Sequence, residues 1–385
     1  MNPKTSKQYK LKPCLDSKAS YKAGATFEEL IAKYGFKREE ILRLAGNEST
    51  IGASPKAIDA AQRAASSSNF YDEPQSSELI NALEKSFAED ISMQELGIVV
   101  GNGMDRIIEQ ILNLFCEKGD SIVNFSPSFD FYSFAALREG LKILDLGRDT
   151  ENFYPNLEGL KEKIYQHQEE TSSQVKIIFI CSPNNPTGTL VQREDLEELA
   201  KFCEQENIVL FIDHAYIEFT DRKTNDFREL ISEYPNTVIG YTFSKVYGLA
   251  GYRVGYALLH KELQELYLKY NTPFLCAKPS LKAAKAALED KEHLQKIIDN
   301  NNQEKPYLVD SLTKLGYFCY PSHANFLLFQ IPESKKLNAD DLLEILKSKG
   351  IILRKAHSVS EKSIRVTIGQ RHENLRLIEA LTSID

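Results

Sequence analysis

Four short segments hold the polar residues whose types and spacing could do chemistry. They are Ser182-Pro-Asn-Asn-Pro-Thr-Gly188, Asp213-His-Ala-Tyr216, Thr242-Phe-Ser-Lys245 with Gly248-Leu-Ala-Gly-Tyr-Arg253, and Gly101-Asn-Gly-Met-Asp105. A desolvated lysine amine beside cationic groups has a lowered pKa and can attack a carbonyl carbon. The glycine turn precedes a helical pattern, and the free N–H groups at the start of a helix can bind an anion. Together these residue types suit one cofactor.

The segments follow stretches that read as strands of one sheet. Buried strands are expected at residues 175–181, 208–212, 237–241 and 254–259, and an amphipathic helix at 195–206. Near-continuous apolar strands separated by helical crossovers predict a mostly parallel sheet covered on both faces. Ligands of such sheets sit beyond the carboxyl ends of the strands, which is where the polar segments fall.

The pattern changes after Pro279. A charged helical stretch at 280–315 comes first, and we expect Pro306 to kink or break it. Strands at 325–329 and 364–368 and helices at 339–349 and 373–382 follow. We therefore predict an α/β protein with a large domain at 50–278, and a smaller α+β domain built from 1–49 and 279–385.

Composition excludes several classes of protein. The 385 residues carry 47 basic and 55 acidic side chains, a net charge of −8, which argues against a general nucleic-acid or membrane-surface binder. The six cysteines are scattered and the seven histidines show no ligand spacing, so we expect reduced thiols and no metal site. The basic N-terminus has no apolar stretch behind it, and nowhere do 18 apolar residues run together. A cytoplasmic protein is expected.

The motifs PNNPTG, DxAY and TFSKxxGLAGxRxGY occur here in this order. The chain resembles the fold-type I aminotransferases from about Tyr21 to its C-terminus, and most strongly their histidinol-phosphate aminotransferase branch. It is also similar to the threonine-phosphate decarboxylases. Any one motif alone would be a weaker sign than the three together. The resemblance implies the PLP-dependent transferase fold, with pyridoxal 5′-phosphate (PLP) as the cofactor.

The resemblance assigns roles around the cofactor ring. PLP acts as an electron sink that the protein binds, orients and tunes. Lys245 is expected to carry PLP as a Schiff base and then to move the substrate's Cα proton. Asp213 is expected to pair with the protonated pyridine nitrogen, and Tyr216 and Asn185 to hydrogen-bond the phenolic oxygen. Phe129 matches the aromatic residue that stacks on the ring.

The phosphate of PLP needs a fixed cup. The expected cup residues are Gly103, Met104, Asp105, Thr242, Ser244 and Arg253, which offer helix N–H groups, hydroxyls and a guanidinium. Tyr71 matches the tyrosine that reaches the cofactor phosphate of the neighbouring subunit. The resemblance therefore implies a homodimer with shared active sites.

Substrate recognition is expected at the mouth of the site. Arg365 matches the arginine that grips an α-carboxylate, and Arg354 matches a branch position that contacts a substrate phosphate. Tyr21 and Asn47 match entrance residues of the branch. These four predict a small phosphorylated amine or ketone as substrate of a PLP-dependent aminotransferase, with an amino acid such as glutamate as donor.

Departures from the branch's usual pattern leave the substrate open. His214 stands where glutamate is common and Met104 where serine is usual, and we expect His214 to be a histidine with satisfied hydrogen bonds and no acid–base role. The alternative is a decarboxylase of phosphoserine or phosphothreonine on the same scaffold. The spacings Tyr21-x-x-Gly24 and Phe129-x-x-Tyr132 favour the aminotransferase. Two further classes fit less well. A PLP-binding regulator would show a DNA-binding module, and a dehydrogenase would show the third glycine of GxGxxG; we find neither feature in this sequence.

Overall fold

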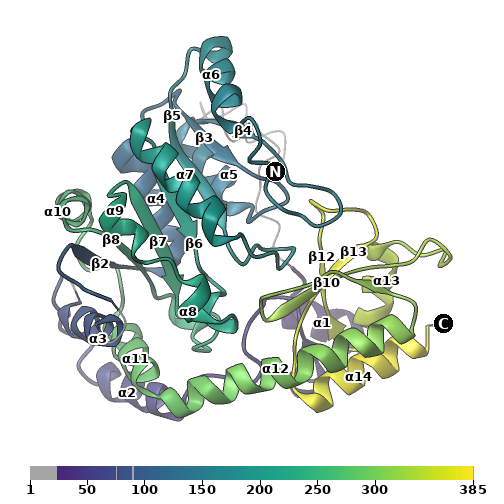
Figure 1. Cartoon of the computed structure of the whole chain (residues 1–385). Helices are drawn as coiled ribbons and strands as arrows, with labels where there is room; N and C mark the ends of the chain where they lie inside the picture. The colour runs from purple at the N-terminus through teal and green to yellow at the C-terminus, as the bar shows by residue number, and fades with distance from the viewer. Residues whose placement is uncertain (1–23, 75, 89–90, 385) are drawn as a thin grey trace, which may run out of the picture.

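The computed structural model describes residues 24–74, 76–88 and 91–384, and its centre is a seven-stranded sheet (Figure 1). In spatial order the strands are β2 (Leu96–Gly101), β8 (Gly255–His260), β7 (Thr237–Thr242), β6 (Val209–Asp213), β5 (Val175–Cys181), β3 (Ser121–Asn124) and β4 (Lys142–Asp145). β8 runs antiparallel to both of its neighbours, and the other pairs are parallel. The prediction of a mostly parallel α/β sheet is confirmed.

Amphipathic helices cover the sheet. α4 (Gly103–Phe115) buries Ile107, Ile108 and Ile111, which recur at helical spacing on its inner face. α7 (Arg193–Gln205) likewise buries Leu196 and Leu199. Figure 1 shows α7 in front of the sheet, with α4 and α5 (Phe131–Glu139) behind it. Strands covered on both faces cannot expose one face to water, which explains their continuous apolar sequences.

The register of the sheet brings the chemical segments together. Cys181 at the end of β5 lies opposite Asp213 at the end of β6, and Asp213 lies opposite Gly240 of β7. The backbone N–H of Ser182 donates to the carbonyl of Asp213 (3.0 Å). The segments that begin after these strands therefore start side by side at one edge.

A second group of elements packs around its own core. Its antiparallel sheet has the order β12 (Arg354–Lys355), β13 (Ser363–Thr367), β10 (Phe326–Gln330) and β9 (Phe318–Cys319), while β1 (Leu42–Arg43) pairs with β11 (Ile351–Ile352). The core includes Leu44, Leu308, Leu342 and Leu377. Helices α1 (Phe27–Tyr34), α13 (Ala339–Ser348) and α14 (Arg371–Thr382) complete the group. Phe326 of β10, however, belongs to the large core around the central sheet, so the two groups also pack against each other. The predicted two-domain division stays a prediction.

The long helical stretch after Pro279 breaks at another place than predicted. α11 (Lys278–Glu289) packs beside α2 (Pro55–Ala65), and α12 (Lys291–Lys314) runs through Pro306 toward α14 (Figure 1). A break at Pro306 is therefore wrong, while a kink there stays a prediction. The helices separate at Asp290, whose carboxylate accepts from the hydroxyl of Ser54 (2.5 Å) and from the amine of Lys56 (2.9 Å). Such distant partners leave no local pattern in the sequence.

The remaining helices lie around the large core. They are α3 (Ser77–Phe87), α6 (Leu160–Thr171), α8 (Arg222–Asn225), α9 (Leu230–Glu233) and α10 (Lys261–Tyr270). Within residues 24–74, 76–88 and 91–384, no helix combines the length and the apolar composition that crossing a membrane requires.

Candidate active site

A cavity of about 530 Å³ is lined both by loops of the central sheet and by residues of the smaller sheet. Seven of the predicted site residues line it: Asn47, Phe129, Asn185, Tyr216, Lys245, Arg354 and Arg365. Tyr71 lies outside this lining and is 82% exposed, and Tyr21 falls outside the described residues. Arg43 and His357 also line the cavity, although the sequence offered no motif that marked them.

Lys245 presents a nucleophilic amine to this cavity. Its Nζ donates to the carbonyl of Gly46 (3.1 Å) and lies 5.7 Å from the ring centroid of Tyr216. Burial lowers the pKa of Lys245 to about 8, and the nearby charge of Arg365 adds to this effect while Glu48 opposes it. A large share of the amine is therefore neutral, and nucleophilic, at mildly alkaline pH.

Asp213 is a buried carboxylate held by two donors. Its Oδ1 accepts from the N–H of Ala215 (2.9 Å), and its Oδ2 accepts from the hydroxyl of Tyr132 (2.5 Å). Burial raises the pKa of Asp213 to about 6, while the hydrogen bond from Tyr132 and the charge of Lys245 oppose the rise. The sequence did not predict this contact, because Tyr132 stood out there only in the spacing Phe129-x-x-Tyr132.

The residues predicted to bind the phosphate lie close together at the start of α4. The hydroxyl of Thr242 donates to that of Ser244 (2.9 Å), and Arg253 reaches Ser244 (3.5 Å) and the carboxylate of Asp105 (2.7 Å). Gly103 has a φ of +75°, and a Cβ there would collide with the guanidinium of Arg253. Glycine is favoured at this position, because another residue would strain the backbone and push the guanidinium of Arg253 aside.

The first turn of α4 also has donors to offer. Among the described residues, Asn102 makes no side-chain capping hydrogen bond to this helix. A Cβ on Gly255 of β8 would collide with the backbone N of Met104, so glycine lets the strand approach the helix start. Free N–H groups, two hydroxyls and a guanidinium are the donor set that a phosphate monoester needs, so these residues fit the phosphate of PLP.

The two predicted substrate arginines form a pair at the cavity. Arg354 of β12 lies directly opposite Arg365 of β13 in the antiparallel ladder. Arg365 donates to Oδ1 of Asn185 (2.5 Å) and to the carbonyl of Ala45 (2.7 Å). A Cβ on Gly24 would lie 2.9 Å from Nη1 of Arg354, so the guanidinium rests against glycine. Like charges placed opposite each other are unfavourable by themselves, and an anion between them would offset that cost.

Asn47 connects the N-terminal segment to the ring-binding residues. It is buried, with a left-handed φ of +54°, and its amide donates to the hydroxyl of Tyr216 (2.9 Å). Its backbone N–H donates to the hydroxyl of Thr367 (2.9 Å). Asparagine tolerates this backbone conformation better than most residues, so its identity serves both the turn and the contact.

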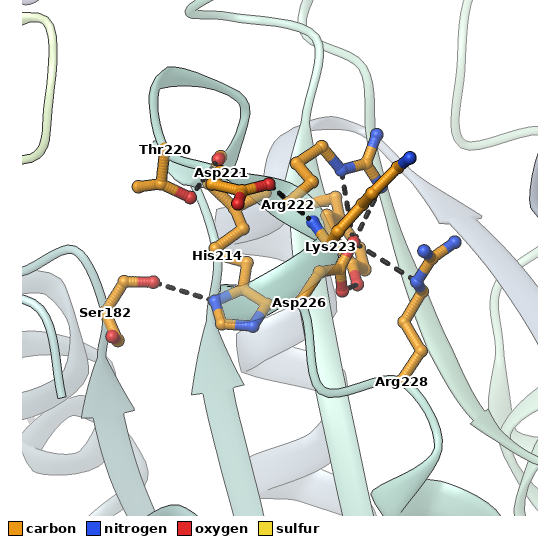
Figure 2. A network of polar contacts seen from close by, with 10 residues as sticks. Ser182, His214, Thr220, Asp221, Arg222, Lys223, Asp226 and Arg228 are labelled. Carbon is orange, nitrogen blue, oxygen red and sulfur yellow. Dashed lines mark hydrogen bonds and ion pairs between the residues drawn. The ribbon is translucent and has the colours of Figure 1, made fainter. Parts of the chain in front are cut away.

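A buried polar network lies behind the carboxyl ends of β5 and β6 (Figure 2). Nδ1 of His214 lies 2.7 Å from the carbonyl of Ser182, so this nitrogen is the donor, and burial lowers the pKa of His214. Asp226 forms ion pairs with Arg222 (2.7 Å) and Arg228 (3.2 Å). Although burial works against it, the charge of Arg222 holds the pKa of Asp226 below its ordinary value. His214 is buried as expected, but its Nε2 is buried without a hydrogen-bond partner among the described residues, so the expectation of a fully satisfied histidine is wrong.

Replacing Asp226 with asparagine is expected to lower the free energy of unfolding by about 3–5 kcal/mol, because Arg222 and Arg228 would lose their buried counter-ion. Urea denaturation followed by circular dichroism measures the loss. The matched control is Asp59→Asn, which removes an exposed i,i+4 partner of Arg63 and is expected to cost less than about 0.5 kcal/mol. Equal effects of the two changes would contradict a stabilising role for the network.

The mostly parallel sheet, the lysine after β7 and the buried aspartate at the end of β6 define an enzyme of the fold-type I PLP class. The family described as Aminotransferase class I and II matches residues 39–381, so the chain belongs to this family. PLP is the cofactor of this family, and the predicted cofactor and enzyme class are confirmed.

Known relatives extend the comparison over almost the whole chain. A protein of Methanosarcina mazei named histidinol-phosphate aminotransferase is 37% identical over 363 residues, covering 94% of this chain and 92% of its own. The solved histidinol-phosphate aminotransferase of Sinorhizobium meliloti, in complex with PLP, has a TM-score of 0.82 at 24% identity and covers 98% of both chains. The L-threonine-O-3-phosphate decarboxylase of Porphyromonas gingivalis has a TM-score of 0.73 at 24% identity, covering 89% of this chain and 99% of its own. Both structures share the fold.

Proposed function

We propose that the enzyme transfers an amino group between a small phosphorylated amine or ketone and an amino acid such as glutamate, with histidinol phosphate as the first candidate substrate. The observation that carries this proposal is the opposed pair Arg354 and Arg365 beside Lys245 in one cavity. Histidinol phosphate offers a phosphate and glutamate offers carboxylates, so the two cations can hold the anionic group of each substrate in turn while the amine of Lys245 reaches the reacting carbon. The relative from Methanosarcina mazei supports the choice of substrate.

We propose which residues bind each part of the cofactor. Phe129 would cover one face of the ring, Asn185 and Tyr216 would bind its phenolic oxygen, and Asp213 its nitrogen. The phosphate would lie on the cup formed by Gly103, Met104, Asp105, Thr242, Ser244 and Arg253. PLP supplies an electron sink for the charge that develops when a bond at the substrate carbon breaks.

The protein residues then divide the work of proton transfer. The ionised Asp213 keeps the ring nitrogen protonated, and the neutral amine of Lys245 takes the Cα proton and returns it. Arg365, which donates to Asn185 and to the carbonyl of Ala45, would hold the anionic group of the substrate and so fix which bond at its reacting carbon is broken. The orientation set by the two arginines decides between loss of the proton and loss of carbon dioxide.

We further propose a homodimer with shared active sites. Tyr71 is 82% exposed and its ring lies 4.6 Å from that of Phe274, which is 44% exposed. An exposed aromatic pair of this kind suits an interface, and Tyr71 would reach the cofactor phosphate of the partner. The unpaired thiols among the described residues, Cys181 and Cys203 included, are in keeping with the cytoplasmic setting that we infer.

A product assay on PLP-loaded protein tests the function. Glutamate formed from 2-oxoglutarate and histidinol phosphate is the expected result, and phosphothreonine and phosphoserine are tested in parallel. Release of carbon dioxide from the phospho-amino acids without any need for a keto acid would make the enzyme a decarboxylase and refute the proposal.

The rate at which the cofactor-free protein takes up PLP is expected to rise with pH through about 8. Only the neutral amine of Lys245 attacks the PLP carbonyl, and its pKa is lowered to about 8, so protonation suppresses uptake below that pH. Stopped-flow absorbance between pH 6 and 10 measures the rate. A midpoint near the ordinary lysine value of about 10.4 would show that burial does not tune this amine.

A further inference from the structure

Tyr132 on α5 is a buried tyrosine whose ring is fixed by its neighbours. It has no exposed surface, and its ring stacks on that of Phe179 in β5, with centroids 4.7 Å apart and planes 5° apart. Its other side meets Phe129 edge-on at 5.5 Å. The hydroxyl of Tyr132 donates to Oδ2 of Asp213 at 2.5 Å and also contacts the thiol of Cys181. A phenol in this position is held in place before any ligand binds.

The two oxygens of Asp213 are bound from different elements. Oδ2 accepts from Tyr132 on α5, and Oδ1 accepts from the N–H of Ala215, which follows β6. Two donors on two oxygens fix both the plane of the carboxylate and its rotation. Each oxygen of an ionised carboxylate has about two acceptor sites, so one site per oxygen remains for a ligand.

We propose that Tyr132 is a positioning residue that keeps the carboxylate of Asp213 ionised and aimed at the ring nitrogen of the cofactor. The inference rests on the role proposed above for Asp213. A hydroxyl that donates to a carboxylate stabilises the charged form, because the protonated carboxyl accepts more weakly. Phe129, which contacts Tyr132 edge-on, also lines the cavity. Tyr132 therefore contacts both the residue proposed to stack on the cofactor ring and the carboxylate proposed to bind the ring nitrogen.

The charges around Asp213 make this hydrogen bond important. Lys245 after β7 favours the ionised form, whereas Asp105 on α4 disfavours it and the thiol of Cys181 at the end of β5 lies close by. Burial raises the pKa of Asp213 to about 6, and Tyr132 opposes this rise. Without the phenol, more of Asp213 would be protonated near neutral pH, and a protonated carboxyl cannot balance a cationic ring nitrogen.

The test compares Tyr132→Phe with Tyr241→Phe. Tyr241 is a matched control because it is equally buried and its hydroxyl donates to another buried carboxylate, Asp226, at 2.7 Å. Both changes remove one phenol–carboxylate hydrogen bond, and only one of these reaches Asp213. For Tyr132→Phe we expect the Kd for PLP to rise roughly tenfold, and the acid limb of kcat/KM to move up by about one pH unit. Tyr241→Phe should leave both values within about twofold of wild type.

Equal values for the two variants would overturn the proposal. If Tyr132→Phe does not fold, 3-fluorotyrosine at position 132 replaces it: the stronger donor should move the acid limb down, and an unchanged or raised limb refutes the inference. Failure of the wild-type protein to bind PLP would refute the proposed function itself, which separates the two outcomes.

Discussion

Replacing Lys245 with alanine is expected to abolish amino transfer and the visible absorbance of bound PLP. Lys245 is the residue proposed to link to the cofactor and then to move the substrate proton. Among the described residues that line the cavity, the other lysine is Lys355, whose amine contacts the carboxylates of Asp340 and Glu361. Loss of proton transfer alone costs on the order of 10²–10⁴ in rate. The measurements are the absorbance spectrum after loading with PLP and the rate of glutamate formation.

The chain offers a matched control for this change. Lys305 on α12 is a second amine whose pKa burial lowers to about 8, and its Nζ donates to the carbonyl of Ser322 (3.0 Å) outside the cavity lining. Lys305→Ala should therefore keep the PLP spectrum and the turnover. Full activity in Lys245→Ala, or an equal loss in Lys305→Ala, would contradict the assignment of Lys245.

Replacing Asp213 with asparagine is expected to lower kcat by about 10²–10³, the usual cost of losing one preorganised electrostatic contact. The neutral amide cannot balance a protonated ring nitrogen. It also meets two donors, the N–H of Ala215 and the hydroxyl of Tyr132, so its NH₂ group must face one of them. The affinity for PLP should fall as well, which a fluorescence titration measures.

The pH profile adds a second readout for Asp213. Because its pKa is raised to about 6, wild-type kcat/KM should fall as the pH drops through that value, and Asp213→Asn should lack this limb. Asp226→Asn is the comparison, since it should reduce stability but leave the limb in place. A limb that persists unchanged in Asp213→Asn would assign it to another group.

The sequence allowed much of the cofactor side to be predicted. Lys245, Asp213 and Asn185 each follow an apolar strand within an ordered motif, and parallel strands bring such segments to one edge. The contact of Tyr132 with Asp213 spans 81 residues and depends on how α5 packs on β5. Such a contact arises from tertiary packing and has no local pattern. The helix break at Asp290 was missed for the same reason.

Substrate recognition was harder to predict. Arg354 and Arg365 stand eleven residues apart in sequence, and only the antiparallel register of β12 and β13 places them opposite each other. Arg43 and His357 enter the same cavity from separate segments. A substrate is chosen by the distances among such side chains, and these distances are properties of the assembled structure.

The cavity is lined by two different sheets, and this has a consequence for how the enzyme can evolve. The residues proposed to hold PLP belong to the central sheet and its loops, whereas Arg354 and Arg365 belong to the smaller sheet. The hydrogen bonds from Asn47 to Tyr216 and from Arg365 to Asn185 connect the two sets. Outside these two hydrogen bonds, mutations in the smaller sheet would change the proposed substrate contacts and leave the proposed PLP contacts in place, so substrate choice could diverge separately from cofactor binding.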